Sequence, residues 1–171
     1  MLAGLLHLTM TLGCLQAPPP NLPAAAVRNV KEPAMPHAFD FWIGIWEVRA
    51  KDGTLLGHNR VEALLEGIIL QEHWRGAKGG AGTSLNAFMP SKGLWRQTWV
   101  DQQGQFLDLE GALEGHQMVL RGTTSSKEGP VAERITWTPL ADGRVRQLWE
   151  QSHDEGTTWT VAFEGFYARM K

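Results

Sequence analysis

The segment Leu94–Asp101 reads Leu-Trp-Arg-Gln-Thr-Trp-Val-Asp and alternates two kinds of side chain along its length. In an extended strand, successive side chains point to opposite faces. One face therefore carries Arg96, which prefers water, and the other carries Trp95, Gln97 and Trp99. We expect the two tryptophans to point into the protein together with the polar amide between them.

Neighbouring segments repeat this alternation. Trp74 shares a face with Glu72 and alternates with Arg75, and Trp149 shares a face with Gln147. The same rule places charged side chains outside and aromatic side chains inside. By this parity, the final strand is expected to turn three aromatic rings to the inside, namely Trp159, Phe163 and Tyr167.

Turn signals rich in Gly and Asp recur from Phe39 onward and leave ten segments of roughly 8–12 residues, the spacing of antiparallel hairpins. The signals are Asp52-Gly53, Glu66-Gly67, residues 76–82, Ser91-Lys92-Gly93, Gln103-Gly104, Glu114-Gly115, residues 127–130, Asp142-Gly143 and Asp154-Glu155-Gly156. We predict an all-β fold, an antiparallel up-and-down barrel of about ten strands with an internal cavity. Two stacked sheets are the alternative, and residues 39–43 are expected to form a short helical plug at one end.

Composition narrows the classes of function. With a formal net charge of -2 and a pI of about 6.3, the chain lacks the positive field that attracts nucleic acid, so no nucleic-acid partner is expected. The single cysteine, Cys14, excludes an intramolecular disulfide and a cysteine-cluster metal site. No apolar run reaches the roughly 20 residues of a membrane-spanning helix, so no transmembrane span is expected.

The first 37 residues differ from the rest of the chain. Residues 1–17 form an apolar run ending in small residues, as in a signal peptide, although it contains no Lys or Arg. Residues 18–37 open with three prolines and indicate an extended linker, which leaves residues 38–171 as one barrel domain. We expect an extracytoplasmic protein. A lipid anchor at Cys14 is a variant of this prediction, and a cytoplasmic location is the alternative if residues 1–17 are not a signal.

Several polar residues share the inward face with the tryptophans. A buried amide or carboxylate without a partner costs about 1–3 kcal/mol, so these groups need one another, water or a ligand. A hollow barrel that binds a small apolar or aromatic molecule would give these polar groups such partners. The alternative is that the tryptophans simply pack in the core and the amides pair across strands. The predicted ligand-binding residues are Glu72, Trp74, Ser84, Asn86, Trp95, Gln97, Trp99, Gln147 and Trp149.

Two further functions remain open. Glu72 lies between apolar residues, so burial would raise its pKa and suit it to general acid or base catalysis, with Asp101 as a second candidate. The alternatives are that Glu72 hydrogen-bonds Gln97 or Asn86 and that Asp101 caps a turn. A structural role in the cell envelope is the third function. No metal site is expected, because the histidines and carboxylates do not converge.

Residues 76–84 form a glycine-rich stretch that resembles a phosphate-binding loop. No Lys directly follows its last glycine and no helical pattern comes after it, so a nucleotide-binding loop is excluded. We expect this stretch to form a loop at the rim of the barrel, where it is a candidate entrance, or portal, to the cavity.

The stretch Ser152-x-Asp154-x-Gly156-x-Thr158-Trp159 matches an Asp-box. In such a turn the Asp side chain caps backbone N–H groups and the Gly takes a positive φ. We expect Asp154, Gly156 and Trp159 to be structural.

Two motifs resemble those of a bacterial family of calycin-like (lipocalin/nitrobindin-type) β-barrels whose function is not established. They are Phe39-Asp40-Phe41-Trp42-Ile43-Gly44-Ile45-Trp46 and Trp95-Arg96-Gln97-Thr98-Trp99-Val100-Asp101, and the resemblance spans Phe39 to Arg169. The element Gly44-x-Trp46 looks like the opening signature of lipocalins, in which the Trp packs under an Arg from the final strand. The resemblance implies that Arg169 stacks on Trp46 and that both are structural.

Related barrels of the nitrobindin type bind haem through a histidine near the C-terminus. Residues 158–170 of this chain contain no histidine, so haem is disfavoured and no cofactor is expected. The expected partner is a small hydrophobic or aromatic ligand, and the sequence carries no signal for an oligomeric state.

Overall fold

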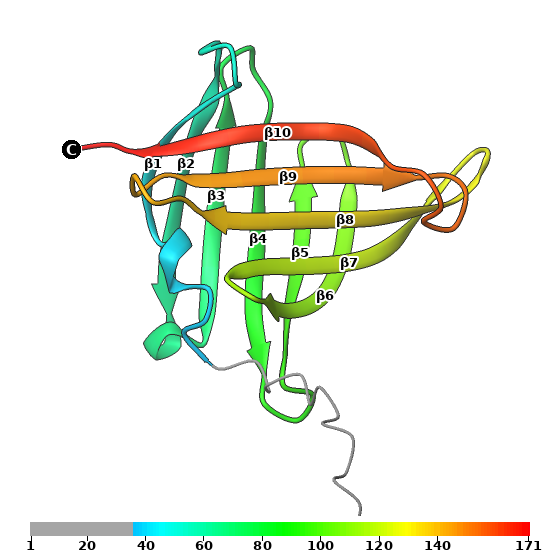
Figure 1. Ribbon diagram of the computed structural model, residues 1–171, viewed down its shortest axis with the longest axis horizontal. Coiled ribbons are helices and arrows are strands. Elements are labelled where there is room, and N and C mark those ends of the chain that lie inside the picture. The colour runs from blue at the N-terminus through cyan, green and yellow to red at the C-terminus, as the bar shows by residue number, and fades with distance from the viewer. Residues whose placement is uncertain (1–35) are drawn as a thin grey trace, which may run out of the picture. The chain divides into compact units, whose positions relative to one another are not determined.

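The computed structural model describes residues 36–171, which form a closed barrel of ten antiparallel strands (Figure 1). Each strand pairs with the next along the chain, and β1 pairs with β10 to close the ring. The up-and-down barrel is confirmed, and the alternative of two stacked sheets is wrong. The elements are η1 Asp40–Trp42, β1 Gly44–Arg49, β2 Leu55–Leu64, η2 Leu65–Gly67, β3 Ile69–Gly76, β4 Ala81–Met89, β5 Leu94–Asp101, β6 Phe106–Glu114, β7 Gln117–Ser126, β8 Gly129–Pro139, β9 Val145–Ser152 and β10 Thr160–Arg169.

The nine predicted turns fall at the nine connections between strands, with small differences at three of them. β3 extends to Gly76 and β4 begins at Ala81, β6 extends to Glu114, and β8 begins at Gly129. The predicted signal peptide (residues 1–17), most of the predicted linker (residues 18–37) and the lipid anchor at Cys14 lie outside the described residues. The described residues, 36–171, contain no helical segment with the length and hydropathy of a membrane span.

The predicted inside and outside faces are observed. Leu70 and Glu72 of β3 are buried while Arg75 is exposed, and Gln97 of β5 is buried while Arg96 is exposed. The barrel wall therefore carries its charges mainly on the outside because a charged group loses its hydration when it is buried.

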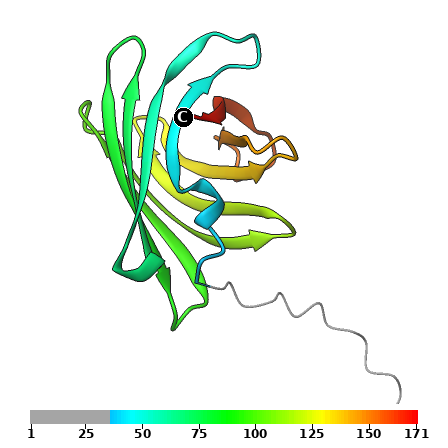
Figure 2. The same ribbon diagram turned by 90° about the vertical axis from the view of Figure 1, so that its left-hand side faces the viewer.

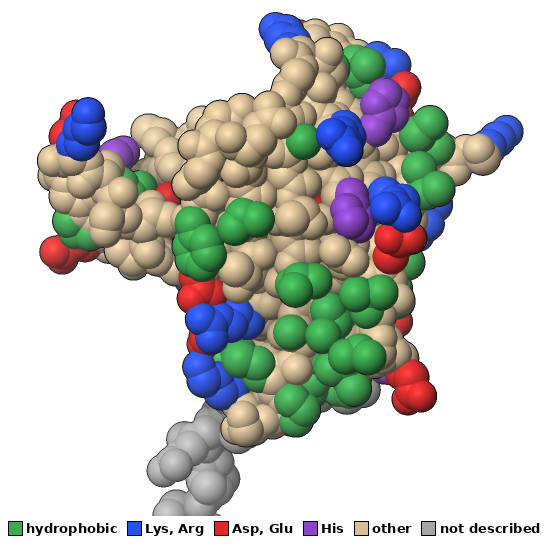
Figure 3. All heavy atoms as spheres, turned by 180° about the vertical axis from the view of Figure 1, so that it is seen from behind, with side chains coloured by type: hydrophobic (Ala, Val, Ile, Leu, Met, Phe, Trp, Pro, Cys, Tyr) green, Lys and Arg blue, Asp and Glu red, His purple; other side chains and the backbone are tan. Residues whose placement is uncertain are grey.

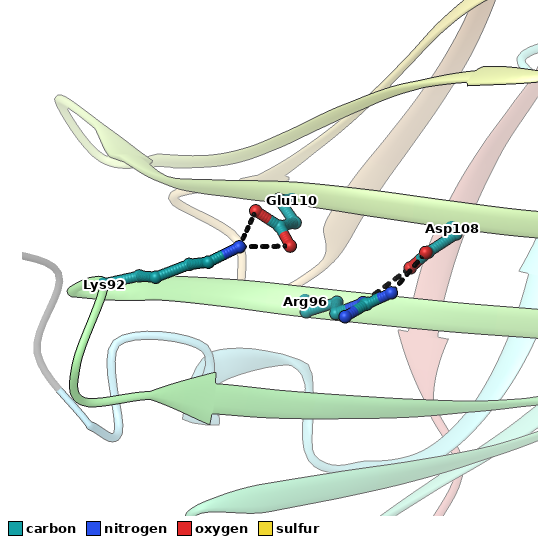
Figure 4. A network of polar contacts seen from close by, with 4 residues as sticks. All are labelled: Lys92, Arg96, Asp108 and Glu110. Carbon is teal, nitrogen blue, oxygen red and sulfur yellow. Dashed lines mark hydrogen bonds and ion pairs between the residues drawn. The ribbon is translucent and has the colours of Figure 1, made fainter.

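Ion pairs join neighbouring strands on this outer face. Arg96 of β5 donates to both carboxylate oxygens of Asp108 in β6, and Lys92, in the turn before β5, donates to both of Glu110 in β6 at 2.9 Å (Figure 4). Such exposed pairs contribute only about 0–1 kcal/mol each. The charged side chains mainly determine which face of each strand points outward, because burying them would remove their charges from water.

One end of the barrel is closed by an aromatic floor, made of Phe39, Trp42, Trp46, Trp95 and Trp137. All five side chains are fully buried. The helical turn η1, which was predicted as a plug, carries Trp42 and lies within the curve of the sheet (Figure 2). The Phe39 ring lies 5.0 Å from the ring of Trp42, 5.7 Å from that of Trp95 and 5.0 Å from that of Trp137.

The closing strands β1 and β10 meet at a cation–π contact. Trp46 is the register partner of Arg169, whose guanidinium carbon lies 4.4 Å from the centre of the indole. A Cβ at Gly44 would collide with the Arg169 guanidinium, so a glycine there leaves room for the stack. The predicted geometry of this pair is confirmed.

Trp159 is an exception to the predicted parity. The pairing of β10 with β9 shifts between Val161 and Phe163, so Val161 faces outward while Phe163 and Tyr167 face inward. A β-bulge of this kind adds one residue and reverses the faces on its two sides. Trp159 precedes the bulge, and its ring lies 4.0 Å below the guanidinium of Arg134 on the outer face. The inward placement of Trp159 is therefore wrong.

The β9–β10 connection is the Asp-box turn that the sequence predicts. Asp154 accepts hydrogen bonds from the backbone N–H of Thr158 at 2.8 Å and from its hydroxyl at 2.6 Å, and Ser152 donates to Asp154 at 2.7 Å. These bonds lower the pKa of Asp154 to about 2. Gly156 has a φ of +88°, and Trp159 donates to its carbonyl. Asp154, Gly156 and Trp159 thus hold a turn.

Apolar side chains also reach the surface. Leu64, Leu65, Ile68 and Leu85 are each exposed, and they come from β2, η2 and β4 and the residue after η2. Figure 3 shows hydrophobic side chains gathered over part of the outer face, with charged side chains at the edges of this area. This area departs from the pattern of charge outside the barrel.

The floor should be the most sensitive part of the fold. Replacing the fully buried Trp46 by Ala removes an indole and leaves a cavity, and we expect the free energy of unfolding to fall by about 3–5 kcal/mol. Urea unfolding monitored by circular dichroism measures this change. Leu65→Ala, at a side chain that is 71% exposed, is the control and should change stability by less than about 0.5 kcal/mol. A loss below about 1 kcal/mol for Trp46→Ala would contradict the role of the floor.

Candidate functional site

Beyond the floor, the barrel encloses a cavity of about 320 Å³, within the range of small-molecule sites. Its mouth is formed by the β3–β4 and β5–β6 loops, at the ends of the strands opposite the floor. Gly79 and Gly80, from the predicted rim loop, are part of this mouth and have φ values of +92° and +90°. The lining residues are Glu72, Trp74, Gly79, Gly80, Ala81, Gln97, Trp99, Asp101, Gln103, Gln105, Leu107, Ile135, Gln147, Trp149, Phe163 and Tyr167.

Four aromatic rings form one part of the lining, the aromatic wall: Trp74, Trp99, Trp149 and Phe163. Each is only partly buried, unlike the rings of the floor. Trp74 meets Phe163 edge to face with 5.9 Å between ring centres. Ring faces that border a cavity can stack on an apolar or aromatic guest.

Glycines make room for two of these rings. A Cβ at Gly82 would overlap the ring of Trp99, its neighbour across β4 and β5, and a Cβ at Gly57 would lie 2.7 Å from the ring of Trp74. Both indoles therefore lie over backbone that has no side chain. The cavity wall depends on glycine at these two positions because a larger residue would displace the rings.

Trp149 is held by a buried carboxylate that the sequence analysis missed. Its indole N–H donates to Glu133 at 2.6 Å, and Glu133 also accepts from Thr124 at 2.7 Å and from Gln151 at 3.1 Å. Glu133 is 1% exposed. It is in phase with Ile135, so the parity rule would have found it. We interpret Glu133 as a positioning residue for the indole.

A second group of lining residues forms the polar wall: Glu72, Gln97, Gln147 and Tyr167. Glu72 accepts hydrogen bonds from Ser84 Oγ at 2.6 Å and from Asn59 Nδ2 at 2.8 Å. Tyr167 donates its hydroxyl to Gln147. The polar wall therefore places a carboxylate, two amides and a phenol beside the aromatic rings.

The partners of Glu72 differ from those that the sequence predicts. Gln97 donates to Asn86 at 2.9 Å, and Asn86 donates to Ser84 at 2.9 Å, so neither amide bonds Glu72 directly. Ser84 is the register partner of Glu72, whereas Asn86 lies opposite Leu70. Asn59, which sequence reasoning did not identify, reaches Glu72 from β2 on the other side. Cross-strand register decides these bonds.

Burial raises the pKa of Glu72 to about 7, against the lowering effect of its bonds from Ser84 and Asn59. A carboxyl group that is buried without a cationic partner holds its proton more tightly, because burial disfavours the charged form. The pKa of Tyr167 is raised well above its usual value, first by burial and then by the nearby Glu72. The two groups thus share one desolvated region of the wall.

The structure sorts the nine predicted ligand-binding residues into two sets. Glu72, Trp74, Gln97, Trp99, Gln147 and Trp149 line the cavity, whereas Trp95, Ser84 and Asn86 do not. Trp95 is fully buried in the floor, 5.9 Å from the ring of Phe88. Ser84 and Asn86 lie behind the polar wall, where they support Glu72. These three positions are corrections. Parity gives the face of Trp95 but not its depth along the strand, and it does not tell which of two register partners, such as Ser84 and Glu72, borders the cavity.

Asp101, the second catalytic candidate, lies at the mouth of the cavity. Its Oδ1 accepts hydrogen bonds at 2.9 Å from the backbone N–H groups of Gln103 and Gln105. Asp101 therefore caps the β5–β6 turn, which is the alternative that the sequence analysis left open.

Neither a metal nor haem finds a suitable set of ligands in the described part of the chain. Within residues 36–171, no group of three His, Cys, Asp or Glu side chains could hold a metal ion. The described lining contains no His, Cys or Met to ligate haem iron. Tyr167 is the one lining residue of a haem-ligating type, and its raised pKa opposes the phenolate that iron would require. The residues do not fit haem.

Comparison with models of known protein families and with curated proteins finds no match to this chain. The resemblance to calycin-like barrels therefore stays a prediction, compatible with the ten-strand closed barrel.

The raised pKa of Glu72 predicts a specific dependence of stability on pH. Because the folded protein holds this proton more tightly than the unfolded chain, the free energy of unfolding should fall as pH rises from about 4.5 to about 7. The fall amounts to about 3 kcal/mol. Glu72→Gln should remove it, so the variant gains stability relative to the wild type over this interval.

Urea unfolding of both proteins at several pH values gives the difference, in which the other titrating groups cancel. Ser84→Ala removes a bond that favours the ionised form, and it should extend the loss of stability to higher pH. If the free energy of unfolding changed with pH in the same way in the wild type and in Glu72→Gln, the raised pKa of Glu72 would be contradicted.

Proposed function

We propose that this protein binds a small molecule with an apolar or aromatic body in the cavity of its barrel. The observation that carries the proposal is the contrast between two sets of tryptophans. Those of the floor are sealed by neighbouring rings, whereas Trp74, Trp99 and Trp149 border a cavity of about 320 Å³. Apolar surface facing such a cavity favours a guest that removes it from water.

The lining also provides groups that would orient a guest. Gln97 and Gln147 bring amide groups to the cavity, and Glu72 and Tyr167 bring a carboxyl and a phenol. Most ligand sites combine a mainly apolar lining with a few such polar groups. Stacking would supply affinity, and the polar wall would select guests with matching hydrogen-bonding groups.

The rest of the barrel suits a binding role. The strands are joined into a closed ring, and the floor fills one end, so the route to the cavity lies at the mouth, between the β3–β4 and β5–β6 loops. We propose the glycine-rich loop as the portal. Membership of the calycin-like family and export through residues 1–17 are further parts of the proposal, supported by the motifs and by the apolar N-terminal run.

Tryptophan fluorescence tests binding directly because three indoles border the cavity. A panel of hydrophobic probes and host-cell metabolites should contain members that quench the emission of the wild type in a saturable way. Trp99→Leu should weaken such a ligand by about tenfold through loss of ring stacking. The matched control is Trp159→Leu, whose ring lies outside the barrel and whose loss should leave the affinity unchanged.

The proposal fails if no compound in the panel binds the folded protein. It also fails if the two variants weaken binding equally. Native mass spectrometry of protein purified from its own host adds an independent measurement, since a bound small molecule adds a discrete mass.

An enzyme is the second candidate function, and the pKa of Glu72 is the observation in its favour. A carboxyl group with a pKa of about 7 that lines a cavity can donate or accept a proton near neutral pH. The third candidate, a structural role in the envelope, would be favoured by a solid barrel, which this one is not.

If Glu72 is catalytic, turnover of a substrate should depend on pH around 7 and should fall by about a hundredfold or more in Glu72→Gln. Binding of the same substrate should persist in that variant because the shape of the side chain is kept. Turnover and affinity measured in parallel separate the two candidates. Full activity in Glu72→Gln would exclude it as the acid or base.

A further inference from the structure

The charged groups in the cavity lining are all of one sign. Of the described residues that line it, Glu72 and Asp101 are acidic, and none is Lys, Arg or His. The basic side chains of β3 and β5, such as Arg75 and Arg96, are on the outer face. An ionised Glu72 therefore gives the interior a negative potential, which the low polarity of the surrounding wall strengthens.

Glu72 is a buried carboxylate whose hydrogen-bond donors are both neutral. It is 4% exposed, and its two oxygens accept from an amide and a hydroxyl, those of Asn59 and Ser84. Buried charges in proteins are normally paired with an opposite charge. Within residues 36–171, no Lys, Arg or His forms an ion pair with Glu72.

Glu133 provides an internal comparison. It is also buried and also bonds neutral groups, but it accepts three hydrogen bonds, and it is not among the residues that line the cavity. Glu72 accepts one hydrogen bond at each oxygen and borders the cavity, so each oxygen keeps the capacity to accept a further hydrogen bond. Glu133 is satisfied by the protein, and Glu72 is open to a ligand.

The aromatic wall favours the same kind of guest. The face of an indole carries partial negative charge and attracts a cation placed over it, most strongly where water is excluded. Trp74, Trp99 and Trp149 border the cavity that Glu72 lines. A carboxylate beside several indoles is a combination that recognises amines and quaternary ammonium groups.

We infer that the ligand is an organic cation: an amine or quaternary ammonium group joined to an apolar or aromatic body, with its charge between Glu72 and the aromatic wall. This inference rests on the proposed ligand binding and specifies the class of ligand. Anionic molecules such as carboxylic acids are excluded, because they would meet a negative potential without a basic partner in the lining.

Three probes of similar shape and different charge test the inference in the wild-type protein. They are benzyltrimethylammonium, its neutral analogue neopentylbenzene, and 3-phenylpropanoate. Fluorescence titration at about pH 8.5, where Glu72 is ionised, gives their affinities. We expect the cation to bind at least about tenfold more tightly than the neutral analogue, and the anion to bind most weakly.

Glu72→Gln keeps the side chain's shape and removes its charge. It should weaken the cation by about tenfold and change the affinity of the neutral analogue by less than about twofold. The control is Asp108→Asn, which removes a negative charge from the outer face, where Asp108 pairs with Arg96. It should leave the order of the three affinities unchanged. The series in the wild type remains decisive if either variant fails to fold.

Neutral or anionic probes that bind as tightly as the cation would overturn the inference while leaving the proposed function in place. The same holds if none of the three probes binds while other compounds in the hydrophobic panel do. If no compound of any charge binds, the proposed function itself fails.

Discussion

The pairing of β1 with β10 turns a ten-strand sheet into a barrel. It closes the sheet, and a closed sheet has no free edge and only two faces, an inside and an outside. Every side chain on a strand therefore points either to the solvent or to the interior of the barrel. The stack of Arg169 on Trp46 lies at this closing pair, and Gly44 leaves the space it needs.

Closure also explains why polar groups inside the barrel matter. The aromatic floor, which includes the stacked rings of Phe39 and Trp42, fills one end of the barrel with apolar side chains. It does not fill the rest of the interior. The remaining interior holds carboxyl and amide groups, each bonded to a neighbour on the adjacent strand. These bonds keep the polar wall in place without filling the cavity. Glu72 is thus fixed in position while part of its hydrogen-bonding capacity stays open.

The two buried carboxylates, Glu133 and Glu72, have different positions in the candidate site. Glu133 fixes the indole of Trp149 through a direct hydrogen bond, which makes one ring of the aromatic wall rigid. Glu72 is supported by Asn59 and Ser84 from the strands on both sides. A wall held in place by such bonds loses less entropy when a guest binds, and in the proposed binding function this would favour one ligand shape and charge.

The number of strands, the turns and the face of most side chains can be predicted from the sequence alone, because turn residues and alternation along a strand are local properties. The depth of a side chain in the barrel and its neighbours on other strands depend on how distant segments pack and pair. Trp95 and Trp99 share a face of β5, yet one is sealed in the floor and the other borders the cavity, depending on where η1 plugs the barrel. The bulge that turns Trp159 outward and the register that brings Asn59 to Glu72 arise from pairing between distant segments, which no local pattern encodes.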